Sequence, residues 1–98
     1  MDVEHWLNGI CFQWDPRKAA ANLRKHGVNF ETACEAFFDP FLRWIDSEVV
    51  AGEEREGFIG MTGAWQLLIV AYADRRDAIR LISVRPATPE ERRAYEDY

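Results

Sequence analysis

Residues 15–27 gather several side chains suited to contact a phosphate. The segment has four basic residues against one acid, within a 98-residue chain of formal net charge −5. Lys18, Asn22 and Lys25 fall at i, i+4 and i+7, a spacing that places them on one face of a helix. His26 follows, and the unperturbed pKa of histidine suits proton transfer near neutral pH. The same pattern also fits a solvated surface helix whose last-turn histidine is structural, because the helix dipole favours a cation there.

A second set of cations lies near the end of the chain. Arg80 and Arg85 interrupt an otherwise aliphatic segment, residues 78–85, which also carries Ser83. Strand alternation would point Ser83 and Arg85 to one face and Arg80 to the other. An arginine among aliphatic side chains is costly to bury unless it meets an acid or a phosphate. The structural alternative to a phosphate is an ion pair with one of the acids Glu31, Asp39 and Asp46.

Arg55 is the single base in an acidic segment, residues 46–56, which has five carboxylates. A solvated charge pair is its default interpretation. The net negative charge argues against general nucleic-acid binding, which depends on cations that meet phosphates. Because the basic and acidic segments are separate, however, one part of the surface can contact a polyanion while another contacts a basic partner.

Several other chemistries find no support in the sequence. It has no GxGxxG, GxxxxGK[ST] or GxSxG pattern and no metal-ligand spacing, so we expect neither a cofactor nor a metal. Cys11 and Cys34 are expected to be reduced and buried, with a disulfide as the alternative. The remaining lysine, arginine, histidine and tyrosine side chains suit RNA cleavage. RNA supplies its own nucleophile, the 2′-hydroxyl, so the protein must hold the backbone, move protons and stabilise the extra charge.

Local signals predict the elements that position these residues. Asp15-Pro16 begins a helix and Gly27 ends it. Asn29 caps a second helix, whose apolar stripe runs from Phe30 to Phe38 before Asp39-Pro40 stops it. Thr88-Pro89-Glu90-Glu91 is a capping box that opens a last helix reaching about Tyr98. Period-2 or apolar runs predict strands at residues 10–14, 41–47, 58–61, 65–73 and 78–85, with turns at 49–54, 62–64 and 74–77.

Together these elements predict an α+β fold in one domain spanning residues 1–98. Two N-terminal helices would cover one face of a mainly antiparallel sheet of about four to five strands, followed by a C-terminal helix. Residues 1–9 show no clear period and are expected to be a loosely held lead-in. The longest apolar run, residues 67–73, is far shorter than the ~20 residues that span a bilayer, and no signal peptide is evident. We therefore expect a cytoplasmic protein that does not contact the membrane.

Three stretches of the sequence resemble the BrnT toxin family, which belongs to the RelE-like superfamily of bacterial type II toxin–antitoxin systems. They are FQWDPRKAAANLRKHGVNFETACEAFFDP, GEER and AIRLISVRPATPEERRAYED, and the resemblance covers about residues 11–97. Family members commonly have Glu where Gln13 stands and Ala where Val84 stands. Neither difference removes a charged candidate.

The resemblance implies a RelE-like sheet with packed helices and a ribonuclease that blocks translation. It also implies neutralisation by a BrnA-type antitoxin, in a heterotetramer that contacts DNA only through the antitoxin. Carried over onto this sequence, the polar positions of the family pattern also include Glu91 and Arg92. An alternative is a binding module without catalysis that only pairs with its antitoxin.

These observations lead to a hypothesis for the site. The catalytic set would be Lys25, His26, Arg55, Arg80, Arg85 and Tyr95, and the RNA-binding set Lys18, Asn22 and Ser83. The arginines and Lys25 would bind the scissile phosphate and its neighbours. His26 would be the general base or acid, with Tyr95 or a lysine as the alternative.

Overall fold

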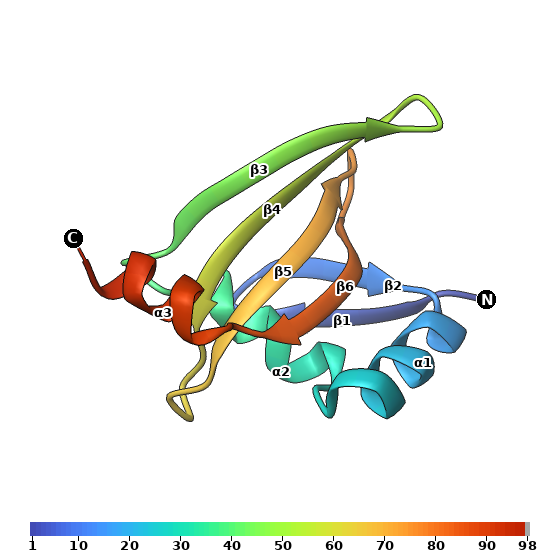
Figure 1. The fold of residues 1–98 in the computed structure, drawn as a ribbon. Helices are drawn as coiled ribbons and strands as arrows, with labels where there is room; N and C mark the ends of the chain where they lie inside the picture. The colour runs from blue at the N-terminus through green and yellow to red at the C-terminus, as the bar shows by residue number, and fades with distance from the viewer. Residues whose placement is uncertain (98) are drawn as a thin grey trace.

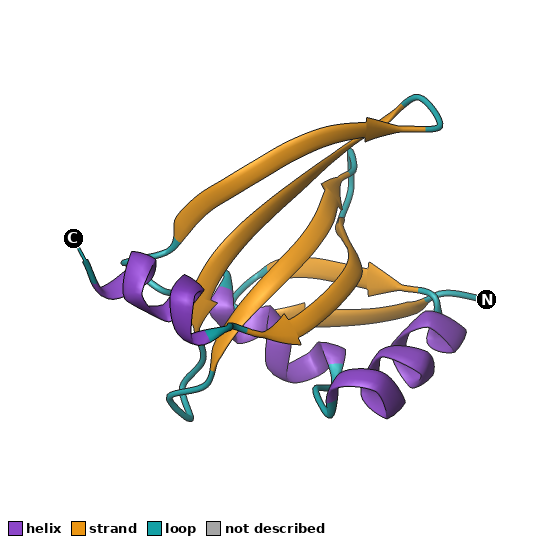
Figure 2. Cartoon of the chain, viewed as in Figure 1, coloured by secondary structure: helices purple, strands orange, loops and turns teal. Residues whose placement is uncertain are grey.

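The computed structural model describes residues 1–97, which form a six-stranded sheet and three helices (Figures 1 and 2). The strands lie side by side in the order β1-β2-β6-β5-β4-β3. All neighbours pair antiparallel except β2 and β6, which are parallel. The elements are β1 (Val3–Leu7), β2 (Ile10–Trp14), α1 (Pro16–His26), α2 (Phe30–Ala36), β3 (Arg43–Val50), β4 (Glu53–Met61), β5 (Leu67–Asp74), β6 (Ile79–Pro86) and α3 (Pro89–Glu96).

The predicted class, α+β with a mainly antiparallel sheet, is confirmed, but the sheet has six strands rather than four or five. The additional strand is β1, so the expectation of a loosely held lead-in at residues 1–9 was wrong. β1 pairs with β2 through a two-residue turn at Asn8 and Gly9, both with positive φ. Asn-Gly is the preferred sequence of such a turn, and this signal was available in the sequence.

Helix α1 begins and ends where its capping residues predict. The Asp15 carboxylate accepts a hydrogen bond from the Arg17 N–H at 2.9 Å, and Pro16 occupies the first turn. Gly27 takes the left-handed conformation, φ 72°, and its N–H donates to the Leu23 carbonyl at 2.8 Å. These local interactions fix both ends of the basic helix.

Helix α2 is shorter than its apolar stripe predicts. Asn29 caps its start as expected, but regular helix stops at Ala36 and the chain tightens into i→i+3 turns. Phe37 still contacts the rings of Phe12, Phe58 and Tyr72, whereas Phe38 contacts the Phe12 ring edge-on and is 40% exposed. The predicted apolar stripe therefore extends through Phe37, and Phe38 lies at its exposed edge.

Strands β3 and β4 form a longer hairpin than expected. The turn consists only of Ala51 and Gly52, both with positive φ, rather than the predicted residues 49–54. Strand β5 lies between β6 and β4, which confirms its predicted central position. The predicted C-terminal helix starts at its capping box and ends at Glu96, and its expected extension to Tyr98 falls outside the described residues.

The core lies between α2 and one face of the sheet. Phe12, Phe58, Val70 and Leu81 from four strands are almost fully buried there, together with Cys34 of α2. Both cysteines are free and buried, as predicted. Burial raises the pKa of the Cys34 thiol to about 12. Helix α3 is drawn in front of the sheet and α2 behind it in Figure 1, and none of the α3 residues is buried. No helix within residues 1–97 is long and apolar enough to cross a membrane.

Candidate functional site

A bulge in β6 decides which way the polar candidates point. Arg80 lies opposite Ala73, whereas Ser83 and Arg85 lie opposite Ala71 and Ile69. These three β5 residues alternate with Val70 and Tyr72, which belong to the core cluster with α2. The register shifts by one residue between the two halves of β6, so Arg80, Ser83 and Arg85 share the sheet face away from α2. We call this surface the open face.

The expectation that Arg80 points opposite to Ser83 and Arg85 was therefore wrong. Simple alternation fails because Ile82 is an extra residue in β6 and shifts the alternation by one position. Leu81 before the bulge and Val84 after it therefore both reach the core.

Arg55 also projects from the open face. Its neighbour Glu56 pairs with Tyr72 on the core side, and the Tyr72 hydroxyl donates to the Glu56 carboxylate at 2.9 Å. Arg55 therefore points the other way, about two strand spacings, or roughly 10 Å, from Arg80. Arg55 and Ser83 line the same cavity of about 270 Å³. The other lining residues are Ala71 and Ile82 of the neighbouring strands and Asp46, Ser47, Glu48 and Glu56 of the β3–β4 hairpin. We call this cavity the Arg55 cavity.

Arg55 has unused hydrogen-bonding capacity in this cavity. Its Nε is buried and has no hydrogen-bond partner, and no carboxylate within residues 1–97 lies within 4.0 Å of its guanidinium. Glu48 is its cross-strand neighbour and also lines the cavity, but the two do not form an ion pair. A buried donor without a partner is costly, so a hydrogen-bond acceptor at this position would be favoured.

Arg80 and Arg85 are each held by a carboxylate. Arg80 donates to Asp2 at 2.7 Å and also to Gln13 at 3.2 Å. Arg85 forms a bidentate pair with Glu91 of α3. Both arginines do form the ion pairs of the structural alternative, but with acids other than Glu31, Asp39 or Asp46. The hydrogen bond from Arg85 lowers the pKa of Glu91 to about 2, and the one from Arg80 lowers the pKa of Asp2.

Asn22 has a structural role that leaves none of its donors for the predicted contact with RNA. The side chain is buried, accepts from the Val84 N–H at 3.0 Å and donates to the Val84 carbonyl at 2.8 Å. It also donates to the Val28 carbonyl at 3.2 Å. The amide thus pairs with β6 as another strand would, beyond the short stretch where β2 pairs with it. All its donors are used, and α1 is fixed beside β6.

The remaining α1 candidates stay on the helix surface. Lys18 and Lys25 are exposed and His26 is half-buried. None of the three lines the Arg55 cavity. The structure therefore places them beside β6 through Asn22 but does not bring them into one cavity with Arg55.

Tyr95 lies at the other end of β4 from Arg55. Its hydroxyl donates to Asp39 at 2.6 Å, and the same carboxylate oxygen accepts from the Met61 N–H at 2.8 Å. Met61 and Arg55 are six residues apart on β4, which corresponds to roughly 20 Å. Burial, followed by the bond to Asp39, raises the pKa of Tyr95 to about 12. Tyr95 is therefore not positioned to exchange a proton at the Arg55 cavity.

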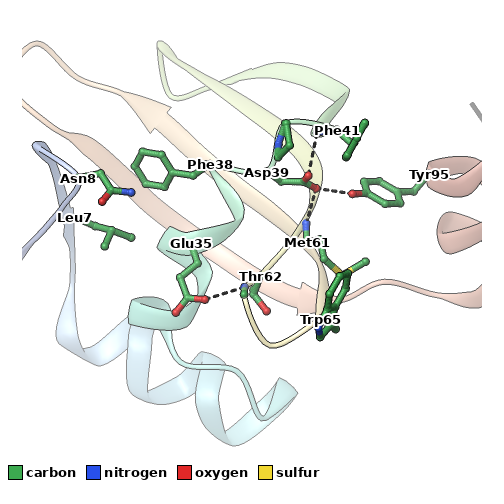
Figure 3. A pocket seen from close by; sticks show the side chains of 12 residues that line it. Leu7, Asn8, Glu35, Phe38, Asp39, Phe41, Met61, Thr62, Trp65 and Tyr95 are labelled. Carbon is green, nitrogen blue, oxygen red and sulfur yellow. Dashed lines mark hydrogen bonds between the residues drawn. The ribbon is translucent and has the colours of Figure 1, made fainter.

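The surroundings of Tyr95 form an apolar groove that our sequence analysis missed (Figure 3). Besides Tyr95, three aromatic side chains line it, namely Phe38, Phe41 and Trp65. The sequence analysis assigned Phe38 to the apolar stripe of the second helix and Phe41 and Trp65 to the first positions of two predicted strands, so no local signal grouped them. Residues 1–97 contain no group of three or more histidine, cysteine or acidic side chains arranged to hold a metal ion.

Comparison with known proteins places this chain in a family. A family model described as the ribonuclease toxin BrnT of type II toxin–antitoxin systems matches residues 14–91. The chain belongs to the BrnT family. As a BrnT protein it is a ribonuclease toxin of a type II system, and this class has RNA as substrate and an antitoxin as partner.

A solved structure supports the BrnT fold. The crystal structure of the Brucella abortus ribonuclease toxin BrnT matches with a TM-score of 0.51 and 23% sequence identity. The match covers 76% of this chain and 92% of the Brucella chain. At this identity the similarity bears on the fold alone. No curated protein matches the chain.

Proposed function

We propose that this BrnT toxin cleaves RNA on the open face by metal-independent acid–base chemistry. The observation that carries the proposal is the buried, unpartnered Nε of Arg55 in a cavity shared with Ser83. A guanidinium presents several donors in one plane, which matches the oxygens of a phosphate. Arg55 would hold the scissile phosphate, and the Ser83 hydroxyl would donate to a neighbouring oxygen.

The reaction needs little more than charge stabilisation and two proton transfers. The 2′-hydroxyl oxygen attacks the adjacent phosphorus and gives its proton to a base, while the bond from phosphorus to the 5′-oxygen breaks. The leaving 5′-oxygen then takes a proton from an acid. His26 and Lys25 are our candidates for these groups, with Lys18 as an RNA contact. None of the three lines the Arg55 cavity, so α1 would have to approach it when RNA binds. RNA bound along β6 would pass α1, because Asn22 holds that helix beside the strand.

Arg80 and Arg85 would join the site by exchanging partners. Each donates through both terminal nitrogens to a carboxylate in the free protein, so RNA phosphates would replace Asp2 and Glu91. Both arginines lie on the same face as Arg55, which supports phosphate contacts along one strand of RNA. This exchange lowers the affinity of the free toxin for RNA without removing the site.

We further propose the partner and location. A BrnA-type antitoxin would neutralise the toxin in a heterotetramer in the cytoplasm, and contact with DNA would run only through the antitoxin. The family supports an antitoxin as partner. The acidic net charge of −5 fits a toxin that does not bind DNA by itself.

The decisive experiment compares Arg55→Ala with Arg75→Ala in an RNA cleavage assay. Arg75 is a suitable control because it is exposed and does not line the Arg55 cavity. It follows β5 directly and pairs with Glu53 at the start of β4. We expect Arg55→Ala to lower the rate about 100-fold, which is typical for loss of one donor to a transition-state oxyanion, and Arg75→Ala to leave it unchanged. Cleavage by the wild type should persist in excess chelator. Equal rates for the two variants would refute the site, and loss of activity on chelation would refute metal independence.

A second candidate function is a module that binds its antitoxin without cleaving RNA. It is favoured by the two ion pairs that neutralise Arg80 and Arg85 in the free protein. Induced expression in a bacterium separates the two functions. Growth arrest with RNA degradation, relieved by the antitoxin, identifies the enzyme, whereas normal growth with intact RNA identifies the binding module.

A further inference from the structure

The apolar groove around Tyr95 is a preformed surface that the chemistry of the open face does not use (Figure 3). Its volume is about 620 Å³. Phe38 and Phe41, from the loop after α2, are 40% and 64% exposed, and Trp65, from the turn between β4 and β5, is 82% exposed. Large apolar side chains gathered in one hollow mark a binding surface, and aromatic residues supply much of the affinity at protein interfaces.

Hydrogen bonds hold the walls of the groove in place. The Asp39 carboxylate accepts from the Phe41 N–H at 2.9 Å, the Met61 N–H at 2.8 Å and the Tyr95 hydroxyl at 2.6 Å. The loop after α2, the end of β4 and α3 are thereby joined at one side chain. Glu35 of α2 accepts from the Gly63 N–H at 3.0 Å and fixes the turn that carries Trp65. A groove fixed in this way needs little rearrangement to bind a partner.

The backbone at Trp65 presents the indole to solvent. Trp65 has a φ of 64°, a left-handed conformation that bulky residues rarely adopt. Its N–H donates to the Thr62 carbonyl at 3.1 Å, which closes the turn. Strained residues of this kind concentrate at functional sites, and an exposed tryptophan at such a position is expected to contact a partner.

The charges of the groove identify the class of partner. Within residues 1–97 the only ionisable side chains that line it are Glu35, Asp39 and Tyr95, so this part of the chain offers no cation to meet the phosphates of RNA. A second copy of this acidic chain would meet carboxylates with a net negative surface. Glu35 is exposed, and its second carboxylate oxygen has no hydrogen bond within residues 1–97. A cation on the partner would pair with this free carboxylate oxygen.

We propose that the antitoxin docks in this groove, an inference that rests on the partnership stated under Proposed function. The docking segment inserts large apolar side chains between Phe41 and Trp65, and a lysine or arginine beside them pairs with Glu35. The groove is separate from the Arg55 cavity, roughly 20 Å along β4. The antitoxin therefore anchors at a surface distinct from the one that binds RNA.

The test measures the affinity of the purified toxin for the protein encoded beside its gene, by calorimetry. Trp65→Ala and Phe41→Ala should each weaken binding at least ~10-fold, as expected for aromatic anchors. The matched control is Trp6→Ala, because Trp6 is 65% exposed but lies outside the groove. The affinity of this variant for the antitoxin should stay within about twofold of the wild-type value. Glu35→Gln should weaken binding and reduce its salt dependence, whereas Glu31→Gln, on an exposed part of α2, should do neither.

Each result has a defined meaning. Unchanged RNA cleavage and unchanged thermal unfolding show that the variants remain folded. Wild-type affinity in both aromatic variants would overturn the docking site while leaving the partnership intact. A loss of RNA affinity would assign the groove to a nucleobase, and a shift from dimer to monomer on size exclusion would assign it to a second copy; either result overturns the proposal. If the wild type does not bind the neighbouring protein, the partnership and this inference both fail.

Discussion

Arg85 and Glu91 form a bidentate ion pair in which both nitrogen–oxygen distances are 2.8 Å. The pair joins β6 to α3 across the open face. A carboxylate held this way occupies the donors that a phosphate would take, so Glu91 competes with RNA for Arg85. Arg43 reinforces the link, because its guanidinium donates to the Ala94 carbonyl of the same helix.

Removal of the Glu91 charge should strengthen RNA binding. We expect Glu91→Gln to lower the Kd for a short RNA about two- to fivefold, because an exposed ion pair contributes up to about 1 kcal/mol. Glutamine still completes the capping box with Thr88, so the helix start is preserved. Glu96→Gln is the control, since Glu96 of the same helix pairs with Arg92 at 3.9 Å and not with Arg85. Fluorescence anisotropy with a labelled RNA measures the difference, and equal Kd values for the wild type and Glu91→Gln would contradict the competition.

The same pair predicts how stability depends on pH. The pKa of Glu91 is lowered from 4.5 to about 2 in the folded protein. Its stabilising contribution is therefore complete above about pH 4.5 and is lost as the pH falls toward 2. Between these limits the wild type should lose more free energy of unfolding than Glu91→Gln. Urea unfolding of both proteins at about pH 5 and pH 2.5 tests this, and parallel losses would exclude the contribution.

Asn22 should be required for stability rather than for RNA contact. Asn22→Ala leaves the Val84 N–H and carbonyl without partners, at a cost of about 2–4 kcal/mol in the free energy of unfolding. Lys18→Ala, on the exposed surface of the same helix, should change it by less than about 0.5 kcal/mol. Chemical denaturation compares the two. A stable Asn22→Ala protein with weakened RNA binding would restore Asn22 to the RNA-contact set.

Gly60 should be intolerant of any side chain. A Cβ at this position would lie 2.7 Å from the Ala36 carbonyl oxygen and 2.9 Å from the Phe58 ring, where α2 packs on β4. We expect Gly60→Ala to destabilise the fold by about 1–3 kcal/mol through overpacking. Gly57→Ala, on the same strand, meets nothing closer than 3.7 Å and should be far milder. Thermal unfolding gives both values, and similar melting temperatures would contradict the close approach.

Local sequence signals predicted most of the helices and strands, whereas pairings between residues far apart in the sequence could not be predicted from them. The caps at Asp15 and Gly27 fixed α1 because each acts within a few residues. The turn at Asn8 was equally local and was overlooked. The Asp2–Arg80 pair joins residues 78 positions apart, and nothing in either neighbourhood indicates it.

The types of the candidate site residues were predictable from the sequence, but the directions and contacts of their side chains were not. Arg55 looked like a solvated charge within an acidic run, and only the fold shows that its Nε is buried without a partner. Asn22 shared a helical face with Lys18 and Lys25, yet that spacing could not reveal the strand edge it completes. Tyr95 belongs to a family-like pattern but lies in a different hollow from Arg55.

The bulge at Ile82 has a consequence for how this toxin can vary. It divides β6 into two stretches whose side chains are out of phase, and the basic character of the open face depends on that phase difference. Deletion of one residue there would turn either Arg80 or Ser83 and Arg85 toward the core, although every residue of the site would remain in the sequence. The length of β6 is thus under a stricter constraint than most of its side chains, and a related sequence that keeps the arginines but loses this residue should lack the site.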